Sequence, residues 1–285
     1  MTNERPQRPP RSPAVAGTFY PREKEALLAA IKESFLCERG PGRVPRKTDE
    51  LPARKIVAGV VPHAGYVYSG PVAAHLYLEL GEARPPKTVV ILGVNHHGTG
   101  GLFTLSDEDW ATPLGVVPTD RELLKALGRP PVEIDARSQR LEHSIEVQLP
   151  FLQYLWGNRF SMVALQVTFM DLPLLTEVGR IVRDATAGKD VLLLSSTDLS
   201  HYLPPEEAAH WDGEALRALQ TLSPGELYET VVSNDISMCG IAPTTALLSA
   251  LEDRKLRIRL LKQGTSGDAE PMETVVGYAS LALEP

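Results

Sequence analysis

The sequence predicts a single α/β domain with a mainly parallel or mixed central sheet flanked by helices. Short, nearly uninterrupted apolar runs rich in β-branched residues alternate with segments of helical periodicity. Apolar runs of this kind are typical of strands that are covered on both faces. No internal repeat and no linker rich in Pro, Gly or Ser divides the chain. One domain over residues 12–285 is therefore expected.

The individual elements follow from these patterns. Core strands are expected at 55–61, 88–93, 161–167 and 191–196, and further strands, some antiparallel at the sheet edge, near 103–105, 114–117, 257–261 and 274–283. Helices are expected at 71–80, 120–127, 145–156, 172–187, 206–222 and 244–251. Thr119 with Glu122, and Ser223 with Glu226, have the spacing of capping boxes at helix N-termini.

Composition narrows the class of protein. Hydrophobic residues make up 43% and charged residues 23% of the 285 residues, and the net charge is −7. A chain without a basic excess is not expected to bind nucleic acid or an anionic membrane. Two cysteines are too few for disulfide bonds to stabilise a fold of this size. No apolar run is long enough to cross a bilayer, and the N-terminal segment lacks the apolar h-region of a signal peptide. We therefore expect a cytoplasmic protein. Residues 1–11, dominated by Pro, Arg and Gln, are expected to form a disordered tail.

Histidine-bearing segments follow three of the predicted core strands. His63 comes after 55–61, His96 and His97 after 88–93, and His201 after 191–196. Because the carboxyl ends of parallel strands line one crevice, these side chains are expected to converge. Imidazole nitrogens bind Fe, Cu, Zn or Ni, so the pattern suggests a metal site. Each histidine alone could equally be a loop residue that hydrogen-bonds to backbone.

Cys239 is a candidate third ligand. It stands just before the helix expected at 244–251, where oriented N–H groups would favour its thiolate. It could instead be an inert buried residue, or a nucleophile assisted by His201. In the segment LEHSIEVQLP at 141–150, His143 or Glu146 could form a polar wall of the pocket, or the carboxylates could simply favour a helix dipole. No G-x-S-x-G, Walker A or H-E-x-x-H motif is present.

Six ordered motifs resemble the Memo family: PAVAGTFYP at 13–21, VPHAGYVYSGPVAAHLY at 61–77, ILGVNHHG at 91–98, EHSIEVQLPFL at 142–152, SSTDLSHY at 195–202 and CGIAPTTALL at 239–248. The resemblance implies the fold of class III extradiol ring-cleavage dioxygenases. It also implies a metal held by His63, His96 and Cys239. Asp198 and His201 would stand beside the metal, with His201 as the counterpart of the dioxygenase acid/base histidine, and His143 would lie on the pocket wall.

The resemblance also implies what the protein does. The metal would be non-haem Fe(II) or Cu, and Zn fits as well because a soft thiolate favours Cu(I) or Zn over harder ions. The expected activity is that of an oxidoreductase acting on a small chelating or aromatic substrate, with His201 moving a proton under the influence of Asp198. The alternative is a non-catalytic adaptor, which binds a peptide or handles metal in the same cleft. AMMECR-type and radical-SAM proteins are implied as partners.

Overall fold

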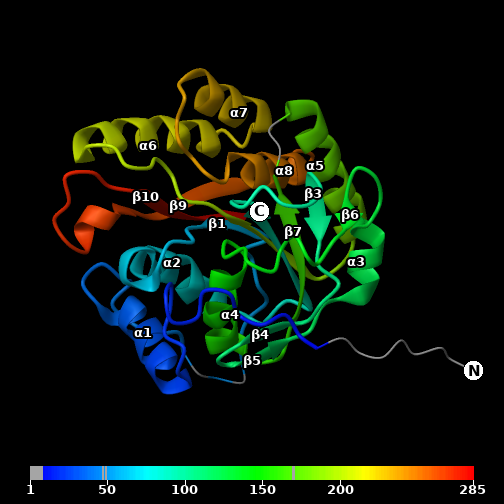
Figure 1. The fold of residues 1–285 in the computed structure, drawn as a ribbon, viewed down its shortest axis with the longest axis horizontal. Helices are drawn as coiled ribbons and strands as arrows, with labels where there is room; N and C mark the ends of the chain where they lie inside the picture. The colour runs from blue at the N-terminus through cyan, green and yellow to red at the C-terminus, as the bar shows by residue number, and fades with distance from the viewer. Residues whose placement is uncertain (1–8, 47, 49, 169–170) are drawn as a thin grey trace, which may run out of the picture.

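The computed structural model describes residues 9–46, 48, 50–168 and 171–285, and one mixed sheet lies between two layers of helices (Figure 1). Within these residues eight strands form the sheet, in the order β6-β3-β7-β2-β8-β1-β10-β9. The strands are β1 (Ala58–Val61), β2 (Thr88–Val94), β3 (Phe103–Leu105), β6 (Glu133–Ile134), β7 (Ser161–Val167), β8 (Val191–Ser196), β9 (Arg257–Thr265) and β10 (Gly277–Glu284). The separate hairpin consists of β4 (Trp110–Thr112) and β5 (Gly115–Val117).

The centre of the sheet is parallel and its edges are mixed. Strands β7, β2, β8 and β1 run parallel to one another. Strand β10 is antiparallel to β1, β9 is antiparallel to β10, and β3 is antiparallel to β7. The predicted α/β fold, with a parallel core and antiparallel strands at the edge, is therefore confirmed. The strand expected near 114–117 exists as β5, but it pairs with β4 outside the main sheet.

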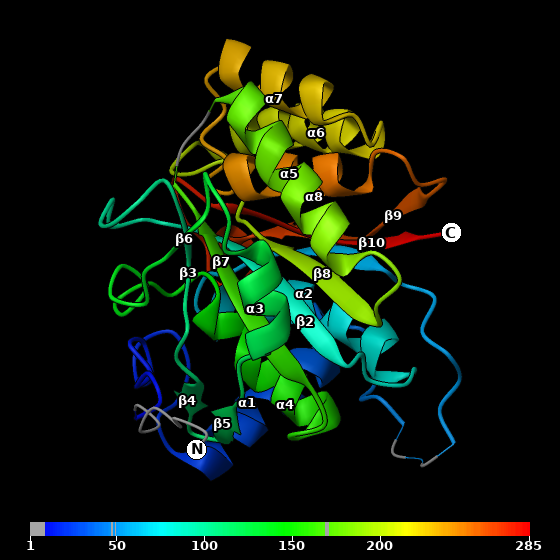
Figure 2. The same ribbon diagram turned by 90° about the vertical axis from the view of Figure 1, so that its right-hand side faces the viewer.

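Helices cover both faces of the sheet, as the two orthogonal views show (Figure 2). On one face lie α1 (Lys24–Leu36), α2 (Tyr66–Gly81) and α4 (Leu149–Trp156), and on the other α3 (Arg121–Leu127), α5 (Leu172–Thr186), α6 (Pro205–Gln220), α7 (Pro224–Ser233) and α8 (Ile241–Leu251). None of the helices in the described part of the chain combines the length and the apolarity needed to cross a bilayer.

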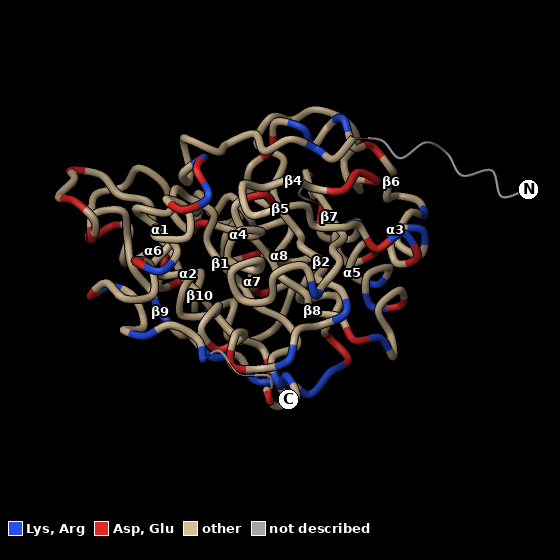
Figure 3. The backbone as a smooth tube through the Cα atoms, turned by 90° about the horizontal axis from the view of Figure 1, so that it is seen from below, with Lys and Arg blue, Asp and Glu red and all other residues tan. Residues whose placement is uncertain are grey.

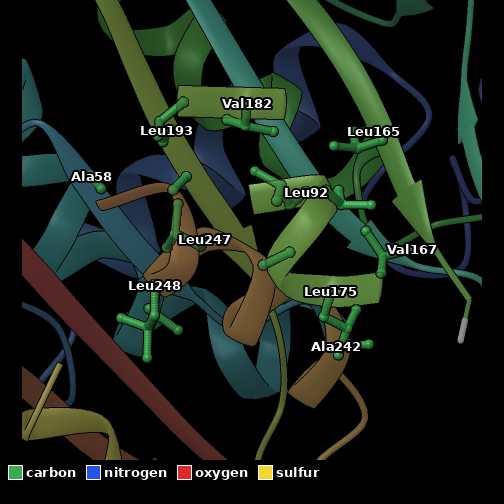
Figure 4. Close-up of a cluster of buried hydrophobic side chains, with 14 of the residues drawn as sticks. Ala58, Leu92, Leu165, Val167, Leu175, Val182, Leu193, Ala242, Leu247 and Leu248 are labelled. Atoms are coloured by element: carbon green, nitrogen blue, oxygen red, sulfur yellow. The ribbon is translucent and has the colours of Figure 1, made fainter. Parts of the chain in front are cut away.

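Each central strand contributes side chains to two hydrophobic clusters. Val60 and Leu92 pack with α5 and α8 on one face, whereas their neighbours Val61 and Ile91 pack with α2 and α4 on the other. Figure 4 shows the first cluster, in which Leu92 and other strand residues meet α5 and α8. Successive side chains of a strand point to opposite faces, so a strand buried on both must be apolar throughout. This explains the uninterrupted apolar runs in the sequence.

Helix α2 begins five residues before the predicted start at residue 71. Pro71 lies inside the helix, where it lacks the N–H that would bond to the carbonyl of Val67. The Arg39 guanidinium donates to that carbonyl at 3.0 Å and to the carbonyl of Tyr68 at 3.3 Å. A distant side chain thus satisfies the group that proline leaves unpaired.

The two predicted helix caps have different outcomes. Ser223 caps α7 and accepts a hydrogen bond from the Glu226 N–H at 3.2 Å, which is the N-cap bond of the predicted capping box. Thr119 does not cap α3, because the cap is its neighbour Asp120, whose side chain accepts from the Leu123 N–H at 3.0 Å. The Thr119 hydroxyl instead donates to the Glu108 carbonyl at 2.6 Å.

The predicted tail has a buried residue at its end. Residues 1–8 lie outside the described residues, but Arg11 is only 3% exposed. Its guanidinium donates to Glu146 Oε2 at 2.6 Å and to the carbonyls of Glu142 and Gln139, and it lies 4.0 Å from the centre of the Trp110 ring. The prediction of disorder is therefore wrong at Arg11. The local composition could not predict this burial, because the carboxylate that pairs with Arg11 lies 135 residues away in the sequence.

Charged residues of both signs are interspersed over the outer loops and helices rather than gathered by sign (Figure 3). This distribution agrees with the modest net charge of −7.

Candidate metal centre

Three histidines meet at the carboxyl ends of β1 and β2. His63 follows β1, His96 follows β2, and His143 comes from the segment before the short 3₁₀ helix η1 (Glu146–Gln148). One nitrogen from each ring can be chosen so that all three lie within 4.8 Å of one another. His63 is buried, whereas His143 is partly buried and His96 is the most exposed. The predicted convergence of His63 and His96 is observed. His143, which was expected on the pocket wall, lies in the same group of rings.

The ring orientations distinguish these histidines. The His63 ring is nearly perpendicular to His96, at 81° with centroids 5.2 Å apart, and to His143, at 84° with centroids 5.4 Å apart. The His96 and His143 rings are stacked, at 15° and 4.6 Å. An imidazole nitrogen holds a metal ion in the plane of its ring, so two stacked rings cannot direct their lone pairs at the same ion. His63 can share an ion with either neighbour, but His96 and His143 cannot share one while they remain stacked.

Cys239 reaches the same point from the loop before α8. Its Sγ lies 3.3 Å from His63 Nε2. Ligand distances of about 2.0 Å for nitrogen and about 2.3 Å for sulfur place such atoms roughly 3.5 Å apart on a tetrahedral ion. The observed separation therefore suits two ligands of one metal. Because α8 begins at Ile241, three residues earlier than expected, Cys239 stands directly before its N-cap Gly240.

Without a bound metal, the side chain of Cys239 favours the neutral thiol over the thiolate. The Asp198 N–H donates to Sγ at 3.3 Å, which favours the anion. Burial, with a further contribution from the Asp198 carboxyl, nevertheless raises the pKa of Cys239 well above its usual range. Burial thus outweighs the stabilisation of the thiolate that the neighbouring N–H group provides. A bound cation would have to supply the stabilisation that burial removes.

Asp198 and His201 lie on the loop after β8, but they do not act on each other as expected. Asp198 Oδ1 accepts a hydrogen bond from the His63 N–H at 2.8 Å, and burial raises the pKa of Asp198 to about 7. His201 lies outside the three-histidine group, and its Nδ1 is 2.8 Å from the Ser237 carbonyl. Burial lowers the pKa of His201, so its neutral form prevails at pH 7. Asp198 thus orients the backbone of His63 rather than the ring of His201.

His97 points away from the three histidines. It is exposed, and its Nε2 lies 3.1 Å from the Leu141 carbonyl. Of the adjacent pair, His96 is the one that faces the other histidines.

Sequence reasoning missed the residues that hold the histidines in place. Glu142 is buried, and its Oε1 lies 2.9 Å from His96 Nδ1, while Ser196 Oγ lies 3.0 Å from His63 Nδ1. Burial acts to raise the pKa of Glu142, but the hydrogen bonds that its carboxylate accepts from His96 and from the Ser144 N–H hold it well below its usual range. For His143, burial dominates and lowers the pKa to about 4. The only signal in the sequence was the unusual polarity of the segment that contains Glu142.

A buried carboxylate anchors the loop that carries Asp198 and His201. Asp212 of α6 accepts a hydrogen bond from the Ser200 N–H at 2.9 Å. Gly277 of β10 accepts from the Leu199 N–H and donates to the Ser200 carbonyl, both at 2.8 Å. A Cβ atom at Gly277 would meet Asp212 Oδ2 at 1.8 Å. The loop is therefore fixed between α6 and β10.

Gly277→Ala is expected to lower the free energy of unfolding by about 3 kcal/mol, because neither backbone nor buried carboxylate can move aside easily. Gly225→Ala in α7 is the control, since its Cβ would come no closer than 3.9 Å to another residue. That control should change stability by less than about 1 kcal/mol. Urea unfolding measures both, and equal stability of the two variants would show that the loop is not clamped here.

The comparisons with known proteins address the family. A model described as "Memo-like protein" matches residues 11–282. The chain belongs to the Memo family. A MEMO1 family protein of Methanococcoides burtonii is 41% identical over 279 residues, covering 96% of this chain and 100% of its own. Another from Methanopyrus kandleri is 42% identical over 281 residues, covering 96% and 98%.

A solved structure supports the fold of this Memo family member. The crystal structure of an uncharacterized protein from Escherichia coli K12 matches with a TM-score of 0.54 and 16% identity, covering 80% of this chain and 99% of the other. At this identity the likeness concerns the fold alone.

Proposed function

We propose that this Memo family member binds one Fe(II) or Cu ion through His63, His96 and Cys239, and serves as an oxidoreductase for a small chelating or aromatic substrate. The observation that carries the ligand set is the position of His63 Nε2. It lies 3.3 Å from Cys239 Sγ, and the His63 ring is perpendicular to that of His96. His143 is the rival third ligand by distance. Because the stacked rings of His96 and His143 cannot bind the same ion, only one of them belongs to the set, and the family resemblance favours His96.

The donor set suits a redox metal. Two imidazoles and one thiolate are ligands that Cu(I), Fe(II) and Zn(II) all accept, and the thiolate favours the softer ions. When bound, a redox-active ion would supply electron transfer and a Lewis-acidic position for substrate oxygens. With only three protein ligands, a tetrahedral or larger coordination shell keeps a position open for substrate.

The chain's own residues would handle protons and orientation. His201 donates through Nδ1 because the Ser237 carbonyl can only accept, so the basic nitrogen of its neutral ring is Nε2. A neutral imidazole at pH 7 can take a proton from a substrate hydroxyl. His143, neutral at pH 7, stacks on His96 and contacts the Phe19 ring at an angle of 45°, and it would form part of the wall beside the substrate.

Metal content tests this proposal directly. The protein is purified without a metal-affinity tag and analysed for bound metals, before and after anaerobic exposure to Fe(II) or Cu(I). We expect near-stoichiometric iron or copper. A protein that holds neither metal after this exposure would contradict the proposal, and would favour the alternative of an adaptor that binds a peptide or a small ligand in the same cleft.

His201→Ala should keep its metal but lose at least about 100-fold in turnover, the usual contribution of a positioned acid/base group. Oxygen uptake by the Fe(II)-loaded protein over a panel of catechols measures this loss. His210→Ala on α6 is the control, because His210 is exposed and its ring packs on the neighbouring Trp211. Equal turnover of the His201 variant and the wild type would remove the proton-transfer role.

We propose a cytoplasmic location and association with AMMECR-type or radical-SAM proteins on the family resemblance alone. Co-purification from cells that express both proteins tests the association.

A further inference from the structure

We propose that two hydrogen-bond networks fix the tautomers of His63 and His96, so that both rings carry their hydrogen on Nδ1 and turn an unprotonated Nε2 toward the metal position. Gln148, Ser196 and Glu142 are then positioning residues for the metal centre. This inference rests on the proposed metal-binding function, but its first test needs no metal.

The first network begins at the Pro62 carbonyl, which can only accept a hydrogen bond. Gln148 Nε2 lies 2.9 Å from the Pro62 carbonyl, and the Tyr77 hydroxyl donates to Gln148 Oε1 at 2.7 Å. A carbonyl has no hydrogen to give, so the amide of Gln148 must turn its NH₂ toward Pro62. The second hydrogen of that NH₂ group points at Ser196 Oγ, 2.8 Å away. Both Gln148 and Ser196 are almost fully buried, so water cannot take over these contacts.

Ser196 links Gln148 to His63, and its hydrogen bonds determine which nitrogen of His63 carries the hydrogen. A serine hydroxyl has one hydrogen and two lone pairs. Its hydrogen goes to the Ser144 carbonyl at 2.6 Å, and one lone pair accepts from Gln148. The remaining lone pair faces His63 Nδ1 at 3.0 Å, so Nδ1 must donate. The Nε2 atom of the neutral ring, which faces Cys239, is left with a free lone pair.

The second network acts on His96 through a carboxylate. Glu142 Oε1 accepts from the N–H groups of His143 and Ser144, and Oε2 accepts from the His96 N–H at 2.7 Å. The same Oε1 lies 2.9 Å from His96 Nδ1. An ionised carboxylate only accepts, so His96 Nδ1 must donate as well. In the neutral ring of His96, which carries a single hydrogen, Nε2 is therefore unprotonated as well.

Fixed tautomers matter because a metal binds only the unprotonated nitrogen. A ring that carried its hydrogen on Nε2 would have to exchange it before binding. Partners of this kind, which hold the far nitrogen of a ligand histidine, are typically worth 10- to 100-fold in metal affinity.

Long-range ¹⁵N–¹H NMR of the metal-free protein tests the tautomers, with assignments from His63→Gln and His96→Gln variants. We expect Nδ1–H signals for both histidines at neutral pH. An Nε2–H tautomer at either ring would overturn the proposal for that ring, whatever the metal content. Failure of the wild type to bind metal would instead contradict the proposed function.

Ser196→Ala tests the first network. We expect mixed tautomers at His63 and a 10- to 100-fold weaker affinity for Zn(II). The matched control is Ser195→Ala on the same strand, which removes a buried hydroxyl bonded to Thr244 at 2.8 Å on the opposite face. It should lose stability to a similar degree and keep the wild-type tautomer and affinity. Equal Zn(II) affinity of the two variants would overturn the positioning role of Ser196.

Glu142→Gln tests the second network. An amide presents hydrogens where the carboxylate accepts, so we expect mixed tautomers at His96 and the same range of affinity loss. Glu108→Gln is the control, because Glu108 is 5% exposed and pairs with Arg140 rather than with a histidine. If Glu142→Gln binds Zn(II) as tightly as this control, Glu142 has no positioning role.

Discussion

His63→Ala is expected to lose its metal almost completely, with an affinity at least about 100-fold below that of the wild type. His63 belongs to every ligand set that the geometry allows, since its Nε2 faces Cys239 and its ring is perpendicular to both His96 and His143. Cys239→Ala should weaken binding strongly as well. His143→Ala should remain within about tenfold of the wild type, because the proposed set uses His96, and His143 cannot share its ion while the two rings are stacked. Competition with a chelator for Zn(II) measures all three.

His75→Ala is the control for these variants. His75 lies on α2, is partly buried and bonds through Nε2 to the Arg39 carbonyl, away from the metal centre. A His143 variant that loses its metal while the Cys239 variant keeps it would show that the three histidines are the ligands, and the proposed ligand set would be wrong.

Arg11→Ala should lower the free energy of unfolding by about 3–5 kcal/mol. The substitution leaves the carboxylate of Glu146 buried without its cation, since the side chains of Arg11 and Glu146 are 1% and 0% exposed. Glu146 would keep three hydrogen bonds, from the N–H groups of Ala14 and Val15 and the hydroxyl of Tyr20. These hold the segment that presents Phe19 to His143, so the loss should also loosen this side of the pocket. Urea unfolding gives the magnitude.

Arg121→Ala provides the matched control, because Arg121 and Asp109 form an exposed ion pair with side chains 53% and 35% accessible. Such a pair contributes at most about 1 kcal/mol. If the two arginine variants unfold at the same urea concentration, the N-terminal segment is not anchored by Arg11.

Much of the fold could be predicted from local patterns. The strands at 161–167 and 191–196 have the expected bounds, because a strand buried on both faces must be apolar along its whole length. The start of α2 could not be predicted, because Pro71 is tolerated only through Arg39, 28 residues before Val67. The burial of Arg11 depends likewise on Glu146, which is remote in sequence. Local patterns do not contain such long-range partners.

The site was predictable in outline and not in detail. The rule that strand ends converge located His63 and His96, and the family resemblance singled out Cys239. The orientation of the rings was not predictable, so neither was the stacking that prevents His96 and His143 from binding the same ion. Nor could spacing reveal that Asp198 faces His63 rather than His201, because both lie within reach of the same loop.

The electronic spectrum of the Co(II)-substituted protein tests the ligand set most directly. A thiolate bound to Co(II) gives an intense charge-transfer band in the near ultraviolet, and imidazoles alone do not. We expect this band in the wild type and in His143→Ala, and its loss in Cys239→Ala. A wild-type spectrum that shows bound Co(II) without the band would contradict the assignment of Cys239 as a metal ligand.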